Sequence, residues 1–207
     1  MQGIIVELVN VSKKYGRRQL FVTINRQICP GECIAVTGSN GSGKSTLLKV
    51  IAGLIRPSSG TVKVHHNGHE VVADKRMPCF GLISPELIFY NAMTGYENLH
   101  FLVRARGVGL SDEQLMHCLE SVGLTGRQHE LLSTYSTGMR QRLKFALLVA
   151  LRPPIWLLDE PSSNLDEEGK KLVKRLVDDA LAQQATVIIA TNDPEEANYA
   201  GQKIALV

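Results

Sequence analysis

Residues 38–46 of this 207-residue chain are Gly38-Ser39-Asn40-Gly41-Ser42-Gly43-Lys44-Ser45-Thr46, and they match the pattern G-x-x-x-x-G-K-[ST]. The β-prone run Cys33–Thr37 comes before this stretch, and apolar residues at helical spacing follow it (Leu47, Val50, Ile51 and Leu54). Glycines let the backbone wrap closely around an anion, and the N-terminus of the following helix presents positive charge to it. The sequence therefore predicts a phosphate-binding loop between a strand and a helix.

Two side chains of this loop suit nucleotide chemistry in particular. Lys44 is expected to reach the β- and γ-phosphates, and the Ser45 hydroxyl is expected to ligate Mg²⁺. All nine residues from Gly38 to Thr46 are candidate nucleotide-binding residues. The alternative is a glycine-rich turn that matches the pattern by accident, and the flanking strand and helix patterns argue against it.

The composition is that of a globular protein with an ordinary core. Apolar residues make up 44% of the chain and charged residues 21%, and no run approaches the roughly 18 apolar residues of a membrane span. The N-terminus shows no signal-peptide pattern, so a cytoplasmic protein is expected. The net charge of +3 is small and aromatic residues are few, so no nucleic-acid partner is expected.

Strand and helix patterns alternate as in a parallel α/β protein. Strands are predicted at 4–11, 20–28, 33–38, 79–83, 155–158, 186–190 and 204–207, with a hairpin at 61–72 around Asn67-Gly68. Helices are predicted from the loop to about Ile55 and at 94–106, 111–122 and 166–184. We expect an α/β P-loop NTPase fold with a mostly parallel sheet core and an N-terminal antiparallel β subdomain. A helical subdomain at about 84–151 is expected to be inserted into a single domain of residues 1–207.

An acidic pair supplies the expected counterpart of the loop. The apolar run that starts at Ile155 ends in Asp159-Glu160. Asp159 is expected to hold Mg²⁺ through its water shell, opposite Ser45. The carboxylate of Glu160 is expected to polarise a water molecule for attack on the γ-phosphate. The alternative is a strand that ends in a solvated acidic turn.

A second helix N-terminus has the features of a phosphate-recognition element. The segment Tyr135-Ser136-Thr137-Gly138-Met139-Arg140-Gln141-Arg142 opens a predicted helix that runs to about Leu151. Ser136 suits the N-cap position, and Gly138 lets the backbone come close to an anion. An ordinary capped helix remains the alternative for this segment taken alone.

At this point the chain resembles the ATP-binding cassette (ABC) ATPases over essentially all 207 residues. Residues 135–139 match the family signature Leu-Ser-Gly-Gly-Gln at its serine and second glycine, Asp-Glu-Pro follows at 159–161, and residues 163–166 resemble the D-loop. The resemblance implies that Tyr15 stacks on adenine. It also implies an ATP-dependent homodimer, or a heterodimer with a related ATPase, in which ATP lies between the loop of one subunit and Ser136–Gly138 of the other.

Two positions depart from the family pattern. Pro85 occupies the place of a glutamine that contacts Mg²⁺ and the attacking water, and Asn192 occupies the place of a switch histidine. Asparagine can donate a hydrogen bond to the γ-phosphate, but it cannot shuttle a proton. We therefore predict intact ATP binding and slow intrinsic turnover. The short chain, the segment at 135–142 and the Ala-Thr-Asn-Asp run at 190–193 are also similar to the haem-exporter-like ATPases of cytochrome c maturation.

The resemblance also implies a transmembrane transporter subunit as the partner, contacted near Ser84–Glu97. This segment contains the apolar residues Ile88, Phe89, Tyr90 and Met93 in a region that has to reach the surface. For any one of these residues, the alternative is a place in the core of the helical subdomain. The expected location is cytoplasmic, peripheral on the inner face of the cell membrane. A slow, nucleotide-gated ABC switch protein and a non-transport ABC protein acting on nucleic acid remain alternatives.

Overall fold

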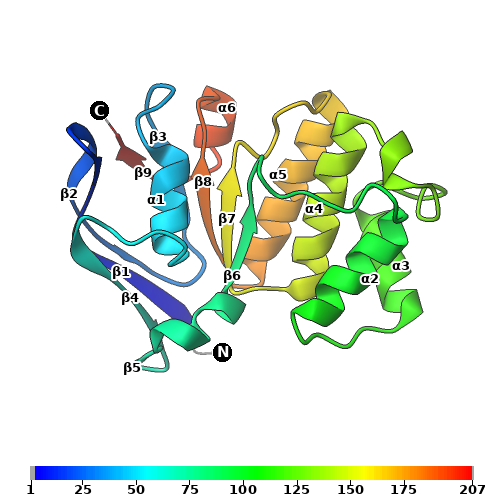
Figure 1. Cartoon of the computed structure of the whole chain (residues 1–207), viewed down its shortest axis with the longest axis horizontal. Helices are drawn as coiled ribbons and strands as arrows, with labels where there is room; N and C mark the ends of the chain where they lie inside the picture. Colours follow the sequence, from blue (N-terminus) through cyan, green and yellow to red (C-terminus); the bar gives the residue numbers. More distant parts are fainter. Residues whose placement is uncertain (1–2, 207) are drawn as a thin grey trace. The chain divides into compact units, whose positions relative to one another are not determined.

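The computed structural model describes residues 3–206, which form two compact units (Figure 1). The first unit contains the chain up to Ser84, Pro153–Pro161 and the chain from Leu176 onward. The second unit contains Pro85–Arg152 and Ser162–Arg175. The strands of the two sheets belong to the first unit, and the second unit is built from helices.

An antiparallel sheet in the first unit has the strand order β2-β1-β4-β5. Its strands are β1 (Ile4–Tyr15), β2 (Arg18–Ile28), β4 (Ser59–His66) and β5 (His69–Glu70). Along β1 the side chains of Ile4, Val6 and Leu8 are buried in alternation with more accessible neighbours, as expected for a sheet with one covered face. Asn67 and Gly68 both adopt positive φ and form the predicted hairpin turn between β4 and β5.

A parallel sheet in the same unit has the order β6-β7-β8-β3-β9. Its strands are β6 (Phe80–Ile83), β7 (Ile155–Asp159), β8 (Thr186–Ala190), β3 (Cys33–Thr37) and β9 (Gln202–Ala205). Every residue of β7 and β8 is buried, which is typical of parallel strands that are covered on both faces. The last strand begins two residues before the predicted one, and the prediction's final residue, Val207, lies outside the described residues.

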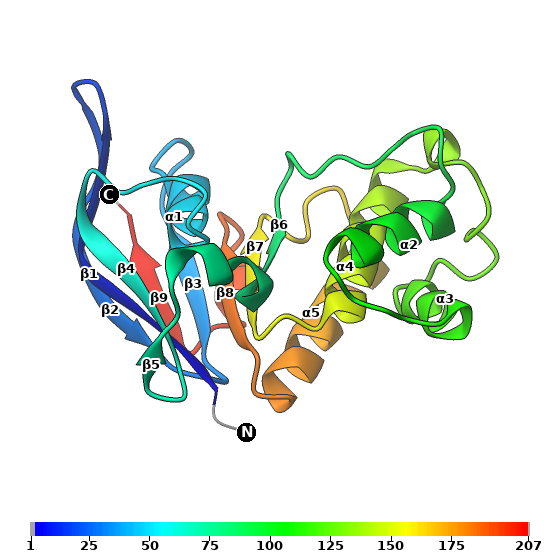
Figure 2. The same cartoon turned by 60° about the horizontal axis from the view of Figure 1, so that its bottom comes forward.

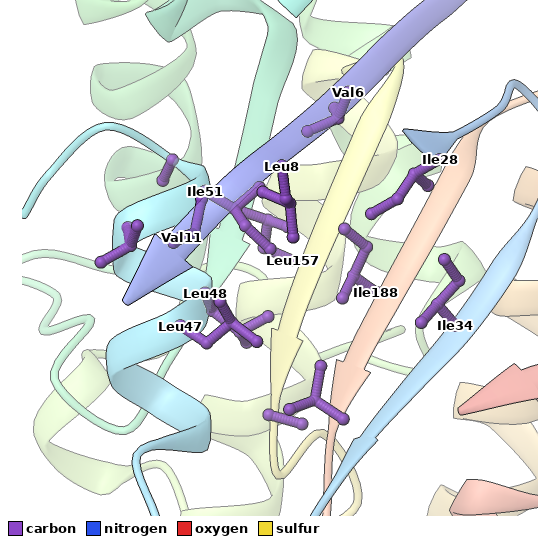
Figure 3. Close-up of a cluster of buried hydrophobic side chains, with 14 of the residues drawn as sticks. Val6, Leu8, Val11, Ile28, Ile34, Leu47, Leu48, Ile51, Leu157 and Ile188 are labelled. Carbon is purple, nitrogen blue, oxygen red and sulfur yellow. The ribbon is translucent and has the colours of Figure 1, made fainter. Parts of the chain in front are cut away.

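Helix α1 (Lys44–Ile51) joins the two sheets of the first unit into one core. Figure 3 shows Leu47, Leu48 and Ile51 of this helix among the side chains of β1 and of the parallel strands. The helix ends earlier than the predicted Ile55, because Gly53 turns into positive φ and the N–H groups of Leu54 and Ile55 bond back to the Lys49 carbonyl. A short helix α6 (Pro194–Ala197), which the sequence patterns did not predict, follows β8.

The second unit is helical, and Figure 2 shows α2, α3 and α4 gathered within it. These helices are α2 (Gly95–Ala105), α3 (Asp112–Ser121) and α4 (Thr137–Leu151), and α5 (Glu167–Ala182) begins in this unit and ends in the first. Capping boxes at Thr94 and Ser111 start α2 and α3. Three 3₁₀ turns connect the larger elements: η1 (Ala73–Lys75), η2 (Met77–Cys79) and η3 (Leu132–Thr134).

Within residues 3–206, none of the helices has the length and apolar character that crossing a membrane requires.

Candidate active site

The loop between β3 and α1 requires glycine at several positions. Gly38, Gly41 and Gly43 have φ values of 151°, 78° and 103°, a region that side-chain-bearing residues rarely adopt. A Cβ atom at Gly38 would collide with the Leu206 carbonyl oxygen and lie 2.6 Å from Ser42 Oγ. The backbone of this loop therefore approaches its neighbours as closely as a phosphate-wrapping loop must approach an anion.

Lys44 is buried at the base of this loop, and its ammonium group donates hydrogen bonds to the oxygen atoms around it. Its Nζ donates hydrogen bonds to the carbonyl oxygens of Gly38 (2.9 Å) and Ser39 (3.2 Å) and to Asn192 Oδ1 (2.7 Å). All three acceptors are neutral. An anionic oxygen that entered the loop would make stronger, charge-assisted bonds with the same ammonium group.

Asn192 directly follows the end of β8 and connects two parts of the loop. While its Oδ1 accepts from Lys44, its Nδ2 donates to Asn40 Oδ1. Its backbone position is fixed by the start of α6, where Asp193 caps the helix by accepting from the Glu195 N–H (2.8 Å). The amide of Asn192 therefore lies against the loop, as the predicted γ-phosphate contact requires.

Ser42 adds a polar atom without a partner to this site. Its Oγ is buried and makes no hydrogen bond with any residue of the part of the chain that the structure describes. Buried hydroxyl groups are usually paired, so an unpaired one inside a loop of this shape suits an external anion.

Ser45 and Asp159 face each other, as expected for two residues that share a metal ion. Ser45 Oγ donates to Asp159 Oδ1 at 2.9 Å, at the point where α1 begins and β7 ends. Burial raises the pKa of the Asp159 carboxyl group and the charge of Glu160 adds to this, while the hydrogen bond from Ser45 acts in the opposite direction. A hydroxyl and a buried carboxylate are oxygen ligands of the kind that Mg²⁺ prefers, so these two residues fit the predicted cation.

Glu160 has a strained backbone at the edge of the parallel sheet. Its φ is 48°, a left-handed conformation that costs about 1 kcal/mol for a residue with a side chain. Its N–H donates to the Ala190 carbonyl oxygen at 2.9 Å, which anchors it to the end of β8. Because β7 and β8 are parallel neighbours, Glu160 and Asn192 follow adjacent strand ends at the same edge of the sheet.

Tyr15 lies at the end of β1 and is 51% exposed, so its ring is accessible to a ligand. Lys13 Nζ lies 4.8 Å from the centre of this ring. The cross-strand partner of Tyr15 is Arg18, whose Nη2 donates to the Gly41 carbonyl oxygen at 2.8 Å. Arg18 was not predicted as a site residue. The signal that could have identified it is its position three residues after Tyr15, across a glycine turn.

Ser136 and Gly138 belong to the second unit. Ser136 Oγ accepts from the Met139 N–H at 3.2 Å, which confirms Ser136 as the N-cap of α4. A Cβ atom at Gly138 would lie 3.5 Å from the Asn164 carbonyl oxygen and 3.7 Å from Leu165 Cδ2, which are ordinary contact distances. The packing of this unit therefore does not require glycine at position 138.

Arg140 braces the segment in front of α4. Its guanidinium group donates to Asn91 Oδ1 (2.8 Å) and to the carbonyl oxygens of Leu132 (2.7 Å) and Tyr135 (3.3 Å). Three fixed donors from one side chain hold the chain on both sides of Ser136.

The segment Ser84–Glu97 decides between the two alternatives for its apolar residues. Ile88 is 80% exposed and Tyr90 is exposed, whereas Phe89 is buried, so the core alternative holds for Phe89 and not for its two neighbours. The cause is Asn98, a buried residue whose side chain bonds the N–H and carbonyl of Tyr90 and fixes the turn that follows Phe89. Tyr90 packs edge-on against the exposed ring of Phe101 at 5.4 Å, a second-unit contact that the sequence did not predict.

Comparison with known proteins identifies the family of this chain. The family model described as "ABC transporter" matches residues 21–163, which is more than half of the chain. The chain belongs to the ABC transporter family. The match confirms the predicted resemblance, the predicted P-loop NTPase fold and the predicted class, an ABC ATPase.

Individual relatives extend the comparison. The uncharacterized ABC transporter ATP-binding protein YdbJ of Bacillus subtilis is 36% identical over 186 residues, which are 89% of this chain and 60% of YdbJ. The chain therefore spans three fifths of that relative's length. The cytochrome c biogenesis ATP-binding export protein CcmA of Rhizobium etli is also 36% identical, over 89% of this chain and 86% of CcmA. The similarity to CcmA is consistent with the predicted subgroup.

A solved structure shows the same fold in a nucleotide-bound state. It is a dimeric, post-hydrolysis state of the ATP-binding cassette MJ0796 bound to ADP and Pi. It superimposes with a TM-score of 0.84 at 25% identity, and the match covers 97% of this chain and 94% of that one.

Proposed function

We propose that this chain is the ATP-hydrolysing subunit of an ABC transporter, which dimerises around ATP and drives a separate membrane subunit. The observation that carries the proposal is the cluster at the carboxyl edge of the parallel sheet. There the loop lysine bonds to the amide of Asn192, which also bonds to Asn40, and a serine next to this lysine bonds to an aspartate at the end of β7. In open α/β sheets, ligands bind at this edge.

ATP binding would replace the contacts that the loop now makes with itself. Lys44 exchanges neutral carbonyl and amide acceptors for charged phosphate oxygens, which make the stronger hydrogen bonds. The N–H groups of the loop, the Ser42 hydroxyl and the N-terminus of α1 then surround the phosphates. Once Lys44 no longer donates to Asn192 Oδ1, the amide of Asn192 can turn and redirect its Nδ2 from Asn40 to the γ-phosphate.

Ser45 and Asp159 would hold Mg²⁺, which neutralises charge on the β- and γ-phosphates when it is bound. Glu160 would orient a water molecule and accept its proton while the water oxygen bonds to the γ-phosphorus. The bond between that phosphorus and the oxygen bridging to the β-phosphate breaks, which leaves ADP and phosphate.

The start of α4 supports a second cassette as the partner in the dimer. Ser136 is exposed, and its hydroxyl accepts the capping bond with its oxygen, so its proton remains available for donation. Gly138 has an unstrained backbone and room for a Cβ atom, so its absence of a side chain suits a ligand that approaches from outside. The dimeric state of the similar cassette MJ0796, bound to ADP and Pi, supports a dimer as the form that acts on nucleotide.

Slow turnover remains part of the proposal. Pro85 has no side-chain hydrogen-bonding group, and Asn192 is held by Lys44 and Asn40 when the site contains no nucleotide. We expect Asn192→His to raise kcat roughly fivefold, because a protonatable group would then face the γ-phosphate. A variant slower than the unsubstituted protein would favour the alternative, a nucleotide-gated switch in which Asn192 is already the best residue.

The membrane partner is proposed to contact the exposed apolar residues Ile88, Tyr90 and Phe101 of the second unit. Such a contact would place the chain at the inner face of the cell membrane. The similarity to CcmA over most of its length supports an exporter-like subgroup related to cytochrome c biogenesis.

The dimer is tested in a background that binds ATP without cutting it. Glu160→Gln should form dimers in ATP and Mg²⁺, visible by light scattering coupled to gel filtration, and monomers in ADP. Adding Gly138→Ala should abolish the dimer without lowering the melting temperature. Gly109→Ala is the matched control, because a Cβ atom at Gly109 meets no atom within 4 Å. A monomeric Glu160→Gln protein at saturating ATP would contradict the proposed dimer.

A further inference from the structure

Arg18 connects the hairpin that bears Tyr15 to the phosphate loop. It is the first residue of β2 and pairs with Tyr15 across the turn at Gly16 and Arg17. Its Nη2 donates to the Gly41 carbonyl oxygen at 2.8 Å, at the outermost part of the loop. Hydrogen bonds to a charged donor are stronger than neutral ones, and the planar guanidinium group fixes their direction.

The contact at Gly41 is one end of a longer line of contacts between β2 and the loop. Two residues further along β2, a Cβ atom added at Gly43 would lie only 3.0 Å from Leu20 Cβ and 3.2 Å from Phe21 Cδ1. Leu20 and Phe21 are both buried. The start of β2 is therefore packed against the loop from Gly41 to Gly43, and Arg18 is its exposed, polar end.

Lys13 also fixes the hairpin that bears Tyr15. Lys13, whose ammonium group lies over the ring, donates to the Arg56 carbonyl oxygen at 2.7 Å. Gln19 Nε2 donates to the Lys13 carbonyl oxygen at 3.0 Å and to that of Phe21 at 2.7 Å. The hairpin tip is thus braced internally, and the bond from Arg18 to Gly41 sets its distance from the loop.

We propose that Arg18 is a positioning residue that makes the binding of the base and of the triphosphate cooperative. The inference rests on the proposed function, in which Tyr15 stacks on the base while the loop holds the phosphates. A nucleotide must bridge both, so a fixed distance between them lowers the cost of binding. A ligand with phosphates alone uses only the loop and gains little from that distance.

The test compares ATP with inorganic tripolyphosphate, each with Mg²⁺, by isothermal titration calorimetry. Arg18→Ala should weaken ATP binding about fivefold to tenfold and tripolyphosphate binding less than twofold, since only ATP needs the fixed distance. Arg18→Lys should recover part of the loss, because lysine keeps the charge but not the fork of donors. Arg17→Ala is the matched control: it removes the same charge from the same turn and leaves the bond to Gly41 in place.

A double-mutant cycle separates coupling from a general loss of charge. If Arg18 acts through the base platform, Arg18→Ala should have little further effect on ATP affinity in a Tyr15→Ala background. In steady-state kinetics, a rise in the KM for ATP should account for most of the change in kcat/KM. The melting temperatures of the nucleotide-free variants should agree with that of the unsubstituted protein.

Several results would overturn the proposal. Equal losses for ATP and tripolyphosphate would show that Arg18 serves the loop alone, and additive effects of the two substitutions would show that it does not act through Tyr15. Equal effects of Arg17→Ala and Arg18→Ala would reduce the role to net charge. If the unsubstituted protein bound tripolyphosphate but not ATP, the proposed function would fail together with this inference.

Discussion

Two helix N-termini of this chain resemble phosphate-binding elements, and they differ in the contacts that each makes within its own unit. At the start of α1, the lysine and serine side chains are bonded to other residues, and the glycines of the preceding loop have positive φ. At the start of α4, Ser136 is exposed, and Gly138 has ordinary backbone geometry and space around it. The lysine, serine and glycines of the first element are therefore explained by contacts within its own unit. In the second element, the glycine has no role in the packing of its own unit.

This difference distinguishes a glycine that folding requires from a glycine that folding does not explain. In the loop, a side chain at Gly38 would collide with the polypeptide itself, so folding alone explains the residue. At Gly138 folding gives no reason, and a partner or ligand from outside must supply one. Substitutions that affect folding and binding differently can therefore test this distinction.

The largest expected difference is between alanine at these two glycines. Gly38→Ala should lower the free energy of unfolding by about 3 kcal/mol, because the methyl group collides with backbone and φ is unfavourable. Gly138→Ala should leave it unchanged or raise it by up to about 1 kcal/mol, because alanine is the better helix former. Urea denaturation of both variants measures the difference, and equal losses would remove the distinction.

The second prediction concerns nucleotide affinity at each helix. Lys44→Met should weaken ATP binding by about 100-fold, because it removes the ammonium group that bonds to the oxygen atoms of the loop and to Asn192. At protein concentrations where the chain is monomeric, Ser136→Ala should leave ATP affinity unchanged. Titration with a fluorescent ATP analogue checks both, and a loss of less than fivefold for Lys44→Met would count against the loop as the primary site.

A smaller effect is expected from the cap of α4. Ser136→Ala should lower the free energy of unfolding by about 1 kcal/mol, since the Met139 N–H loses its acceptor. Ser136→Asp restores an acceptor and should restore the stability. It should still prevent the ATP-dependent dimer of the Glu160→Gln protein, because its charge repels phosphate. If Ser136→Asp also supported dimers, Ser136 would be a cap and nothing more.

The smallest effect is a pH dependence that originates inside α4. Lys144 is buried there, and burial lowers the pKa of its ammonium group. The unfolded chain therefore binds this proton more tightly, so stability rises as the pH increases toward the ordinary lysine pKa of about 10.4. Between pH 7 and pH 10 the unsubstituted protein should gain stability relative to Lys144→Met. Urea denaturation of both proteins measures this. If their free energies of unfolding differed by the same amount across this range, the charge of Lys144 would not contribute to the pH dependence of stability.

Much of the architecture could be predicted from short segments. The loop pattern, the hairpin turn at Asn67-Gly68 and the caps at Ser111 and Ser136 are local features, because each is decided by residues within a few positions of one another. Helix α1 ends before the predicted residue, because Gly53 adopts positive φ and stops the helix although apolar residues continue at helical spacing. The burial of Phe89 does not follow from the sequence alone, because it depends on hydrogen bonds from Asn98, nine residues away.

The family, the fold class and the chemical types of the site residues follow from residue type and spacing alone, because these are enough to specify a phosphate loop followed by a strand that ends in acid. Only the tertiary structure decided that Lys44 is held by Asn192, 148 residues away, and that Arg18 ties the Tyr15 hairpin to Gly41. The strand order of the two sheets creates both contacts, and no local pattern encodes which strand ends become neighbours.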